Sequence, residues 1–296
     1  MPYREDAPDV VIPCRAGNNR ELRYALRSIE RNFDYRHIWV VGAWPQWLKL
    51  DHPRLTAVRR PTMTTKYRTT RAHYKWACDD PRVSDPWVMW NDDFFVLHPM
   101  HELPPIHRGR CDLVTPMFAT WTSKWAQGLR EAEATLKRML PGRVLYNYDI
   151  HTPLLVHKRQ MRRALTIAGS LRSDAVHVRT LYGNLANLGG TSMHDPKTYA
   201  PKILPPTQAW LSSHDHSFAT AVEPHLRRAG LTALSPFELA GVPDHARTAN
   251  PKAQDPRQSM AKRRMRYRVL KTENGNRVVP EAPAMAPAAR RIGRPR

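Results

Sequence analysis

The sequence has few cysteines and no long apolar run, and both absences narrow the class of protein. Its three cysteines, Cys14, Cys78 and Cys111, form neither a CxxC pair nor a Cys/His spacing. They therefore predict neither a disulfide framework nor a structural zinc site, and they fit a reducing compartment. No window reaches the roughly 18 apolar residues of a spanning helix, and the first residues have no signal-peptide core. We therefore expect a soluble, cytoplasmic protein without a membrane span.

Acidic residues are also scarce, 26 against 47 Lys and Arg, so the 296-residue chain has a net charge of +21. Residues 251–296 contain 13 of the basic residues and 3 acidic ones, a net charge of +10. The segment is rich in Pro and Ala and poor in aromatic residues, a composition that cannot bury enough surface to fold. We predict a flexible basic tail at 251–296, free to contact an anionic partner, and one folded domain at 1–250.

The first half of the chain alternates strand and helix patterns. Residues 9–14 (DVVIPC) are continuously apolar after Asp9, like a parallel strand buried on both faces, and residues 21–32 have apolar side chains at helical spacing. Residues 37–43, 55–59 and 87–90 predict further strands. The βαβ pattern predicts an α/β fold, a Rossmann-like mixed sheet flanked by helices. Beyond it we expect a strand at 112–118, an extended segment at 146–156, and helices at 121–140, 157–168, 173–186 and 214–229.

An acidic cluster, Asn91-Asp92-Asp93, directly follows the apolar residues WVMW. Carboxylates at the end of a strand can coordinate Mg²⁺ or Mn²⁺ and leave positions open for phosphate oxygens. The same residues would also suit a solvated turn. We predict a metal site at Asp92 and Asp93.

Basic residues precede this cluster, several of them at a helical spacing of three or four. Cations beside a metal site suit a diphosphate, although scattered Lys and Arg also make an ordinary solvated face. We expect Arg68 and Arg71 to contact phosphate. The basic residues are Arg59, Arg60, Lys66, Arg68, Arg71 and Lys75.

Two later segments carry further candidates. In the extended segment, Asp149 and His151 are alternate residues and would point to one side, as a base and its orienting partner. A structural histidine is the alternative. In Ser212-Ser213-His214-Asp215-His216, Asp215 is a candidate ligand or catalytic group, and a helix N-cap is the simpler interpretation.

Taken in order, these segments resemble the Stealth family of sugar-phosphate transferases, which are related to N-acetylglucosamine phosphotransferase. The most specific match is ELRYALRSIERN followed by HIWVVGAWPQWL. The chain differs from the family in having Arg15 where an acidic residue is usual, and His214-Asp215 in place of an acidic pair. The other similar segments are Asp9-Val10-Val11, NDDFFVL, His151-Thr152-Pro153 with Lys158, and Leu171 to Val176.

The resemblance implies a glycosyltransferase-A-like α/β fold. It also implies that Asp92, Asp93 and Asp215 hold the metal and that His151 and Arg172 surround the transferred group. The Arg-rich chain with its tail is also similar to glycosyltransferases encoded by actinobacterial phages, which would place it in the host cytoplasm.

These observations predict a metal-dependent glycosyltransferase that moves a sugar from a nucleotide-sugar donor to a hydroxyl of a glycan or protein acceptor. His151 or Asp149 would deprotonate that hydroxyl, and Arg172 would hold a phosphate or the acceptor. Sugar 1-phosphate transfer is the first alternative. A nucleic-acid-binding protein is the second, resting on basic charge alone, and a virion component is a third. The expected donor-binding residues are Arg15, Lys66, Arg68, Arg71 and Asn91.

Overall fold

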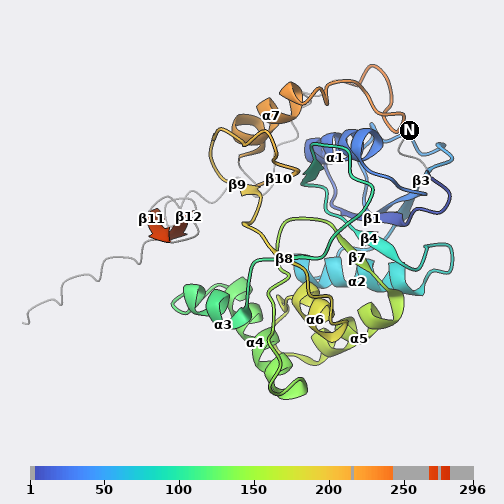
Figure 1. Cartoon of the computed structure of the whole chain (residues 1–296). Coiled ribbons are helices and arrows are strands. Elements are labelled where there is room, and N and C mark those ends of the chain that lie inside the picture. The colour runs from blue at the N-terminus through green and yellow to red at the C-terminus, as the bar shows by residue number, and fades with distance from the viewer. Residues whose placement is uncertain (1–3, 215–216, 243–266, 273–274, 281–296) are drawn as a thin grey trace, which may run out of the picture. The chain divides into compact units, whose positions relative to one another are not determined.

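The structure, a computed structural model, describes residues 4–214, 217–242, 267–272 and 275–280 (Figure 1). The chain divides into two compact units, residues 1–247 and 248–296. No helix within the described ranges is long and apolar enough to cross a bilayer.

The first unit is built on a five-stranded mixed sheet with the strand order β3-β2-β1-β4-β7. Four of these strands are parallel, and β7 runs antiparallel to β4. The mixed α/β fold with a Rossmann-like sheet is therefore confirmed. The strands are β1 (Asp9–Cys14), β2 (Ile38–Gly42), β3 (Leu55–Arg59), β4 (Trp87–Met89) and β7 (Leu154–Val156).

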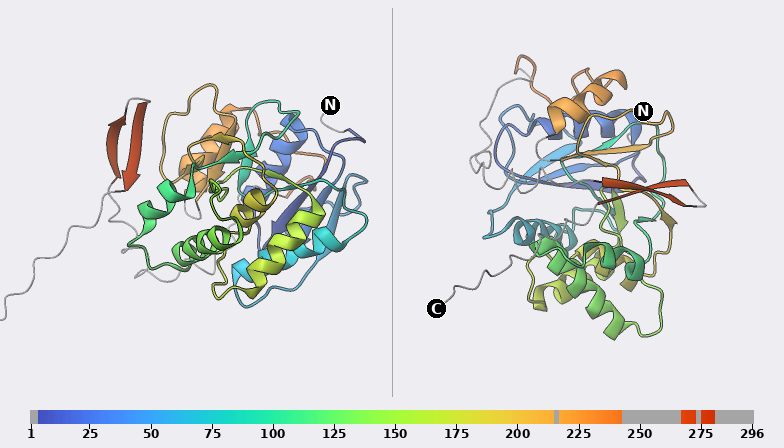
Figure 2. Two further views of the ribbon diagram at one scale, coloured as in Figure 1. Left: turned by 60° about the horizontal axis from the view of Figure 1, so that its bottom comes forward. Right: turned by 90° about the vertical axis from the view of Figure 1, so that its left-hand side faces the viewer.

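Helices cover both faces of this sheet, which explains the continuous apolar run in β1. Val10 and Ile12 enter a core with the apolar side of α1 (Arg20–Asn32), whereas Val11 enters a second core on the opposite face. Figures 1 and 2 show the helices of the second core gathered on that face. They are α2 (Lys66–Asp79), α4 (Lys124–Met139), α5 (Lys158–Ser170) and α6 (Val178–Leu185).

A second, smaller sheet has the order β5-β10-β9. Strand β10 (Trp210–Ser213) runs antiparallel to β5 (Phe94–Val96) and parallel to β9 (Lys197–Thr198). Because β5 begins two residues after Asp92, this sheet brings the late segments of the unit back to the end of β4. The remaining elements are β6 (Ile106–His107), β8 (Thr191–Ser192), α3 (Cys111–Val114), η1 (Thr115–Phe118), η2 (Phe218–Val222) and α7 (Glu223–Arg228).

Three expected elements differ from the structure. The strand predicted at 112–118 is helical, forming α3 and η1, because a short apolar run does not distinguish a strand from a buried helix. The helix predicted at 173–186 begins only at Val178. The helix predicted at 214–229 begins at Phe218, first as a π-helix and then as α7.

In the second unit the structure describes an antiparallel hairpin of β11 (Tyr267–Thr272) and β12 (Gly275–Pro280), in which Val269 pairs with Val278. Composition had predicted a flexible tail here, but β-branched and aromatic residues in these two stretches favour strands locally. The rest of 251–296 lies outside the described residues.

The buried imidazole of His73, on α2, predicts a pH dependence of stability. The side chain is 2% exposed, neither ring nitrogen has a hydrogen-bond partner in the described structure, and burial together with Arg60 lowers its pKa to about 4. Between pH 6.5 and 4 the unfolded chain binds a proton that the folded chain excludes, so the free energy of unfolding should fall as the pH falls. Urea unfolding of the His73→Leu variant should show a shallower fall over this range.

The exposed histidine His98 provides the control for this prediction. The His98→Gln variant should keep the pH dependence of the unmodified protein. An unchanged slope in His73→Leu would show that His73 is not the group responsible.

Candidate active site

The predicted acidic cluster lies at the carboxyl end of β4, beside the end of β1. The sheet order changes direction between these two strands, the position where open α/β sheets bind ligands. Asn19, at the start of α1, joins the two ends. Its side-chain oxygen accepts from the Leu22 amide at 3.1 Å, and its amide nitrogen donates to Asp92 Oδ2 at 2.5 Å. The helix cap therefore also fixes the orientation of Asp92.

The carboxylates at this edge are half-buried and close together. Burial and the neighbouring Asp93 raise the pKa of Asp92 to about 6. Burial, followed by Asp92 and Asp93, raises the pKa of Glu21 to about 8. Arg15, whose guanidinium is 3.4 Å from Glu21, adds positive charge beside them. A cation at this position would relieve the repulsion among these carboxyl groups.

The residues present fit a divalent metal ion that also binds phosphate. Mg²⁺ is commonly bound by one or two carboxylates, and substrate phosphates and water molecules supply its remaining ligands. Asp92 and Asp93 can supply those carboxylates. Within the described part of the chain, no group of three or more His, Cys, Asp or Glu side chains is arranged to hold a metal by itself. Asp215, predicted as a third ligand, lies outside the described residues.

Two strands of the smaller sheet carry polar side chains into this region. Ser212 Oγ donates to Asp93 Oδ2 at 3.4 Å, and Ser213 Oγ donates to Glu21. On the adjacent β9, the Lys197 ammonium lies 3.1 Å from Nε2 of His151. The His151 ring also meets Phe94, the residue after Asp93, at 6.0 Å between centroids. Phe94 thus connects His151 to the chain segment that carries the acidic cluster.

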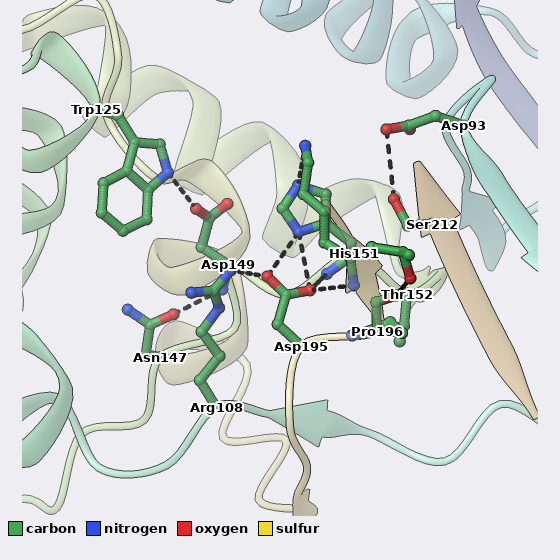
Figure 3. A network of polar contacts seen from close by, with 12 residues as sticks. Asp93, Arg108, Trp125, Asn147, Asp149, His151, Thr152, Asp195, Pro196 and Ser212 are labelled. Carbon is green, nitrogen blue, oxygen red and sulfur yellow. Dashed lines mark hydrogen bonds and ion pairs between the residues drawn. The ribbon is translucent and has the colours of Figure 1, made fainter. Parts of the chain in front are cut away.

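His151 is oriented by Asp195, a residue that the sequence did not indicate. Nδ1 of His151 is 2.9 Å from both carboxylate oxygens of Asp195, and the His151 amide donates to Oδ1 at 3.2 Å (Figure 3). Burial alone would raise the pKa of Asp195, but His151 and Arg108 hold it well below its usual range. The ionised Asp195 favours the tautomer with the proton on Nδ1. Nε2 is then left with a lone pair, which suits a general base.

Asp149, which was expected to orient His151, has other partners. Its Oδ2 accepts from the indole N–H of Trp125 at 2.8 Å and lies 3.4 Å from Nδ1 of His177. Burial would raise the pKa of Asp149, but His177, Arg108 and further cations lower it to about 2. The expected pair is therefore replaced by His151 with Asp195, because Asp149 turns toward α4 and α6.

Two arginines beside His151 were also missed. Arg108 donates to Asp195, and Arg179, at the start of α6, donates to the Thr152 carbonyl at 2.5 Å and lies over the Phe94 ring. Their Nε atoms are buried and have no hydrogen-bond partner in the described structure. The one sequence signal for Arg179 is its position: it is a charged residue in a helix whose neighbouring residues are mostly apolar. Together the two arginines make the surroundings of His151 cationic.

Of the predicted phosphate-binding cations, Arg15 lies beside the carboxylates. Arg68 instead donates to Asp174 at 2.5 Å, and Arg71 donates to the Ala168 carbonyl at 3.0 Å. Both arginines lie in the first half of α2, and their partners lie in α5 or shortly after it. Helical spacing alone could not predict these contacts, because the partners are distant in sequence.

The other predicted residues are also placed. The Lys66 ammonium lies 5.2 Å from the Tyr67 ring. The side chain of Asn91 accepts from the Tyr74 hydroxyl at 3.2 Å, which brings α2 to the acidic cluster. Arg172 is exposed, and its backbone N–H donates to Glu131.

Comparison with known proteins gives partial matches, and no family model matches the chain. The chain is 53% identical over 51 residues to the N-acetylglucosamine-1-phosphotransferase subunits alpha/beta of Mus musculus, and equally to those of Homo sapiens. Each match spans 16% of this chain and 4% of the relative. An exopolysaccharide phosphotransferase of Streptomyces coelicolor is 33% identical over 93 residues, 27% of this chain and 15% of the relative.

Among solved structures, glycosyltransferase GlyE of Streptococcus pneumoniae aligns with a TM-score of 0.35 and 10% identity, over 64% of this chain and 46% of that chain. The sequence matches come from cellular proteins, so a phage origin stays a prediction. They confirm the resemblance seen in the motifs, and over these segments the chain is similar to sugar-phosphate transferases of the Stealth type.

Proposed function

We propose that the chain is a metal-dependent transferase that moves a sugar 1-phosphate from a nucleotide-sugar donor to a hydroxyl acceptor. The observation that carries this proposal is the position of the His151–Asp195 pair. Arg108 is bonded to Asp195, and Phe94, the residue after the carboxylates Asp92 and Asp93, contacts both the His151 ring and the Arg179 guanidinium. A base, cations for a phosphoryl group and carboxylates for a metal then face one reaction centre.

The charge around His151 favours transfer of the sugar phosphate over transfer of the sugar alone. Phosphoryl transfer concentrates negative charge on the phosphoryl oxygens in the transition state, where guanidinium groups are stabilising. Glycosyl transfer, expected first from the sequence, passes through an oxocarbenium-like centre with positive charge, which nearby arginines would oppose. The curated relatives, named as phosphotransferases, support the same choice.

In the proposed reaction, the acceptor hydroxyl takes the place of the Lys197 ammonium at Nε2 of His151. The hydroxyl proton passes to Nε2, and the oxygen forms a bond to the β-phosphorus of the donor. The bond from this phosphorus to the bridging oxygen breaks, and a nucleoside monophosphate leaves with the electron pair. Asp195 keeps the imidazole in the required tautomer and stabilises its cation. Mg²⁺ or Mn²⁺ at Asp92 and Asp93 would act as a Lewis acid on the diphosphate.

The products distinguish the two reactions. We expect the purified chain, given a nucleotide-sugar and Mn²⁺, to release a nucleoside monophosphate, whereas a glycosyltransferase would release the diphosphate. Turnover should be lost with EDTA and should return with added Mn²⁺. The Asp92→Ala plus Asp93→Ala variant should fall to about a hundredth of the original rate or less, since charge neutralisation at the leaving group contributes several kcal/mol. The released nucleotides can be measured by chromatography with a panel of nucleotide-sugars.

A control variant separates this effect from a general loss of folding. Asp112→Ala removes an exposed carboxylate whose partner is the neighbouring Arg110, and it should keep full activity. Activity of the double variant close to that of the unmodified protein would overturn the metal assignment, and release of a nucleoside diphosphate would replace sugar-phosphate transfer by glycosyl transfer.

A further inference from the structure

Three aromatic side chains form a partly exposed cluster at the beginning of α4, which we call the aromatic platform: Phe118, Trp121 and Trp125. Ring centroids are 5.0 Å apart for Phe118 and Trp121, 4.9 Å for Phe118 and Trp125, and 6.3 Å for the two tryptophans. Among the described residues, none of the three belongs to a hydrophobic core of the first unit. Burial in the core therefore does not account for this concentration of aromatic surface.

Polar contacts hold the platform in place. The Arg130 guanidinium donates to the carbonyl of Phe118 at 3.2 Å and to that of Trp121 at 3.1 Å, which fixes the turn between η1 and α4. Ser123 caps α4 through the Ala126 amide at 3.3 Å. These contacts hold the backbone on both sides of Trp121, so less backbone freedom is lost when a ligand binds, which lowers the entropy cost of binding.

The platform is continuous with the proposed active site. Trp125 donates its indole N–H to Asp149, and its ring lies 4.9 Å from that of His177. Arg108 links the platform to the base, since its guanidinium lies 6.0 Å from the Trp125 ring and is bonded to Asp195. In Figure 3, Trp125 and Asp93 lie on opposite sides of His151. A donor bound at Asp92 and Asp93 therefore leaves the platform side open for the acceptor.

We propose that the aromatic platform binds a pyranose ring of the acceptor, so that the acceptor is a glycan. This inference rests on the proposed function. One face of a pyranose presents several C–H groups, whose partial positive charge is attracted to the electron-rich face of an aromatic ring. A sugar stacked on Trp121 or Phe118 would be held beside Arg108 and Asp149, with a hydroxyl directed to His151. Nucleobases also stack on aromatic rings, but the donor's diphosphate is expected at the opposite side of His151.

The test compares transfer to water with transfer to a sugar in the same protein. Trp121→Ala should keep the metal-dependent hydrolysis of the nucleotide-sugar within about twofold and raise the KM for oligosaccharide acceptors about tenfold, the loss expected for one aromatic stacking contact. The probes are cellotetraose and chitotetraose. Quenching of tryptophan fluorescence by these sugars should weaken in the variant, and Trp121→Phe should restore most of the binding.

Two controls keep the outcomes separate. Leu113→Ala removes an exposed apolar side chain on the neighbouring α3 and should leave both activities unchanged. Absent donor hydrolysis in the unmodified protein would count against the proposed function itself. Donor hydrolysis with no response of fluorescence or transfer to either sugar would overturn the platform as a glycan site, as would equal acceptor KM values in Trp121→Ala and the unmodified protein. Fluorescence quenching by the nucleoside monophosphate that is lost in Trp121→Ala would reassign the platform to the donor base.

Discussion

Replacing His151 by asparagine should lower kcat for transfer by about 10²–10⁴-fold, the usual contribution of a positioned general base. Asparagine can still accept or donate at the position of Nδ1, so the contact with Asp195 can persist. It cannot take up a proton at the position of Nε2. Because His151 does not contact the carboxylates Asp92 and Asp93 directly, the KM for the donor should change by less than about threefold. Initial rates of nucleoside monophosphate release at saturating acceptor measure both constants.

An exposed histidine serves as the matched control. His98 is bonded through Nε2 to the Pro206 carbonyl, away from the site, and His98→Asn should keep the original kcat. A kcat of His151→Asn within threefold of the original would exclude His151 as the base. A selective rise in donor KM would instead assign His151 to donor binding.

The fold was largely predictable because its signals are local. The apolar run from Val10 to Cys14 marks a strand covered on both faces, and the structure places a core on each side of it. The spacing of apolar residues in Arg20–Asn32 likewise predicted α1. The parallel pairing of β1 with β2 follows from the βαβ unit that they form with α1. The prediction was wrong where the pattern was short. At Asp112 to Phe118 we predicted a strand, but an apolar run of a few residues fits a helix as well as a strand.

The site was only half predictable, and the reason is sequence separation. Asp92 and Asp93 could be recognised because they follow their strand directly. Asp195, by contrast, is 44 residues from the His151 that it orients, and the contact depends on the pairing of β9 with β10. For Arg68 and Arg71, the local pattern was read correctly but the contact partner was not predicted. Their spacing was correct for one helix, but Asp174 engages both, 106 and 103 residues later in the chain.

A similar mismatch between local pattern and structure appears in α1, where two arginines are buried. Arg23 and Arg27 would be expected at the surface of an amphipathic helix, yet both side chains are almost fully inaccessible. Arg23 Nη1 donates to Glu238 Oε2 at 3.1 Å, and Arg27 donates to both Glu238 oxygens at 2.8 Å. The Ser235 amide and hydroxyl donate to Glu238 Oε1, each at 3.0 Å. One carboxylate thus attaches the segment around residues 235–239 to the helix that begins at the active site.

The Glu238→Gln variant should therefore be destabilised by about 3–5 kcal/mol, because removing one charge of a buried ion pair leaves the other charges without compensation. For a unit of this size, the midpoint of thermal unfolding should fall by roughly 10 °C. Urea unfolding followed by circular dichroism measures the free energy directly. Glu102→Gln, which changes an exposed glutamate in the same way, should remain within about 0.5 kcal/mol of the original. Equal stability of the two variants would mean that hydrogen bonding by a neutral amide is enough at residue 238, and that the charge of Glu238 contributes little to holding α1.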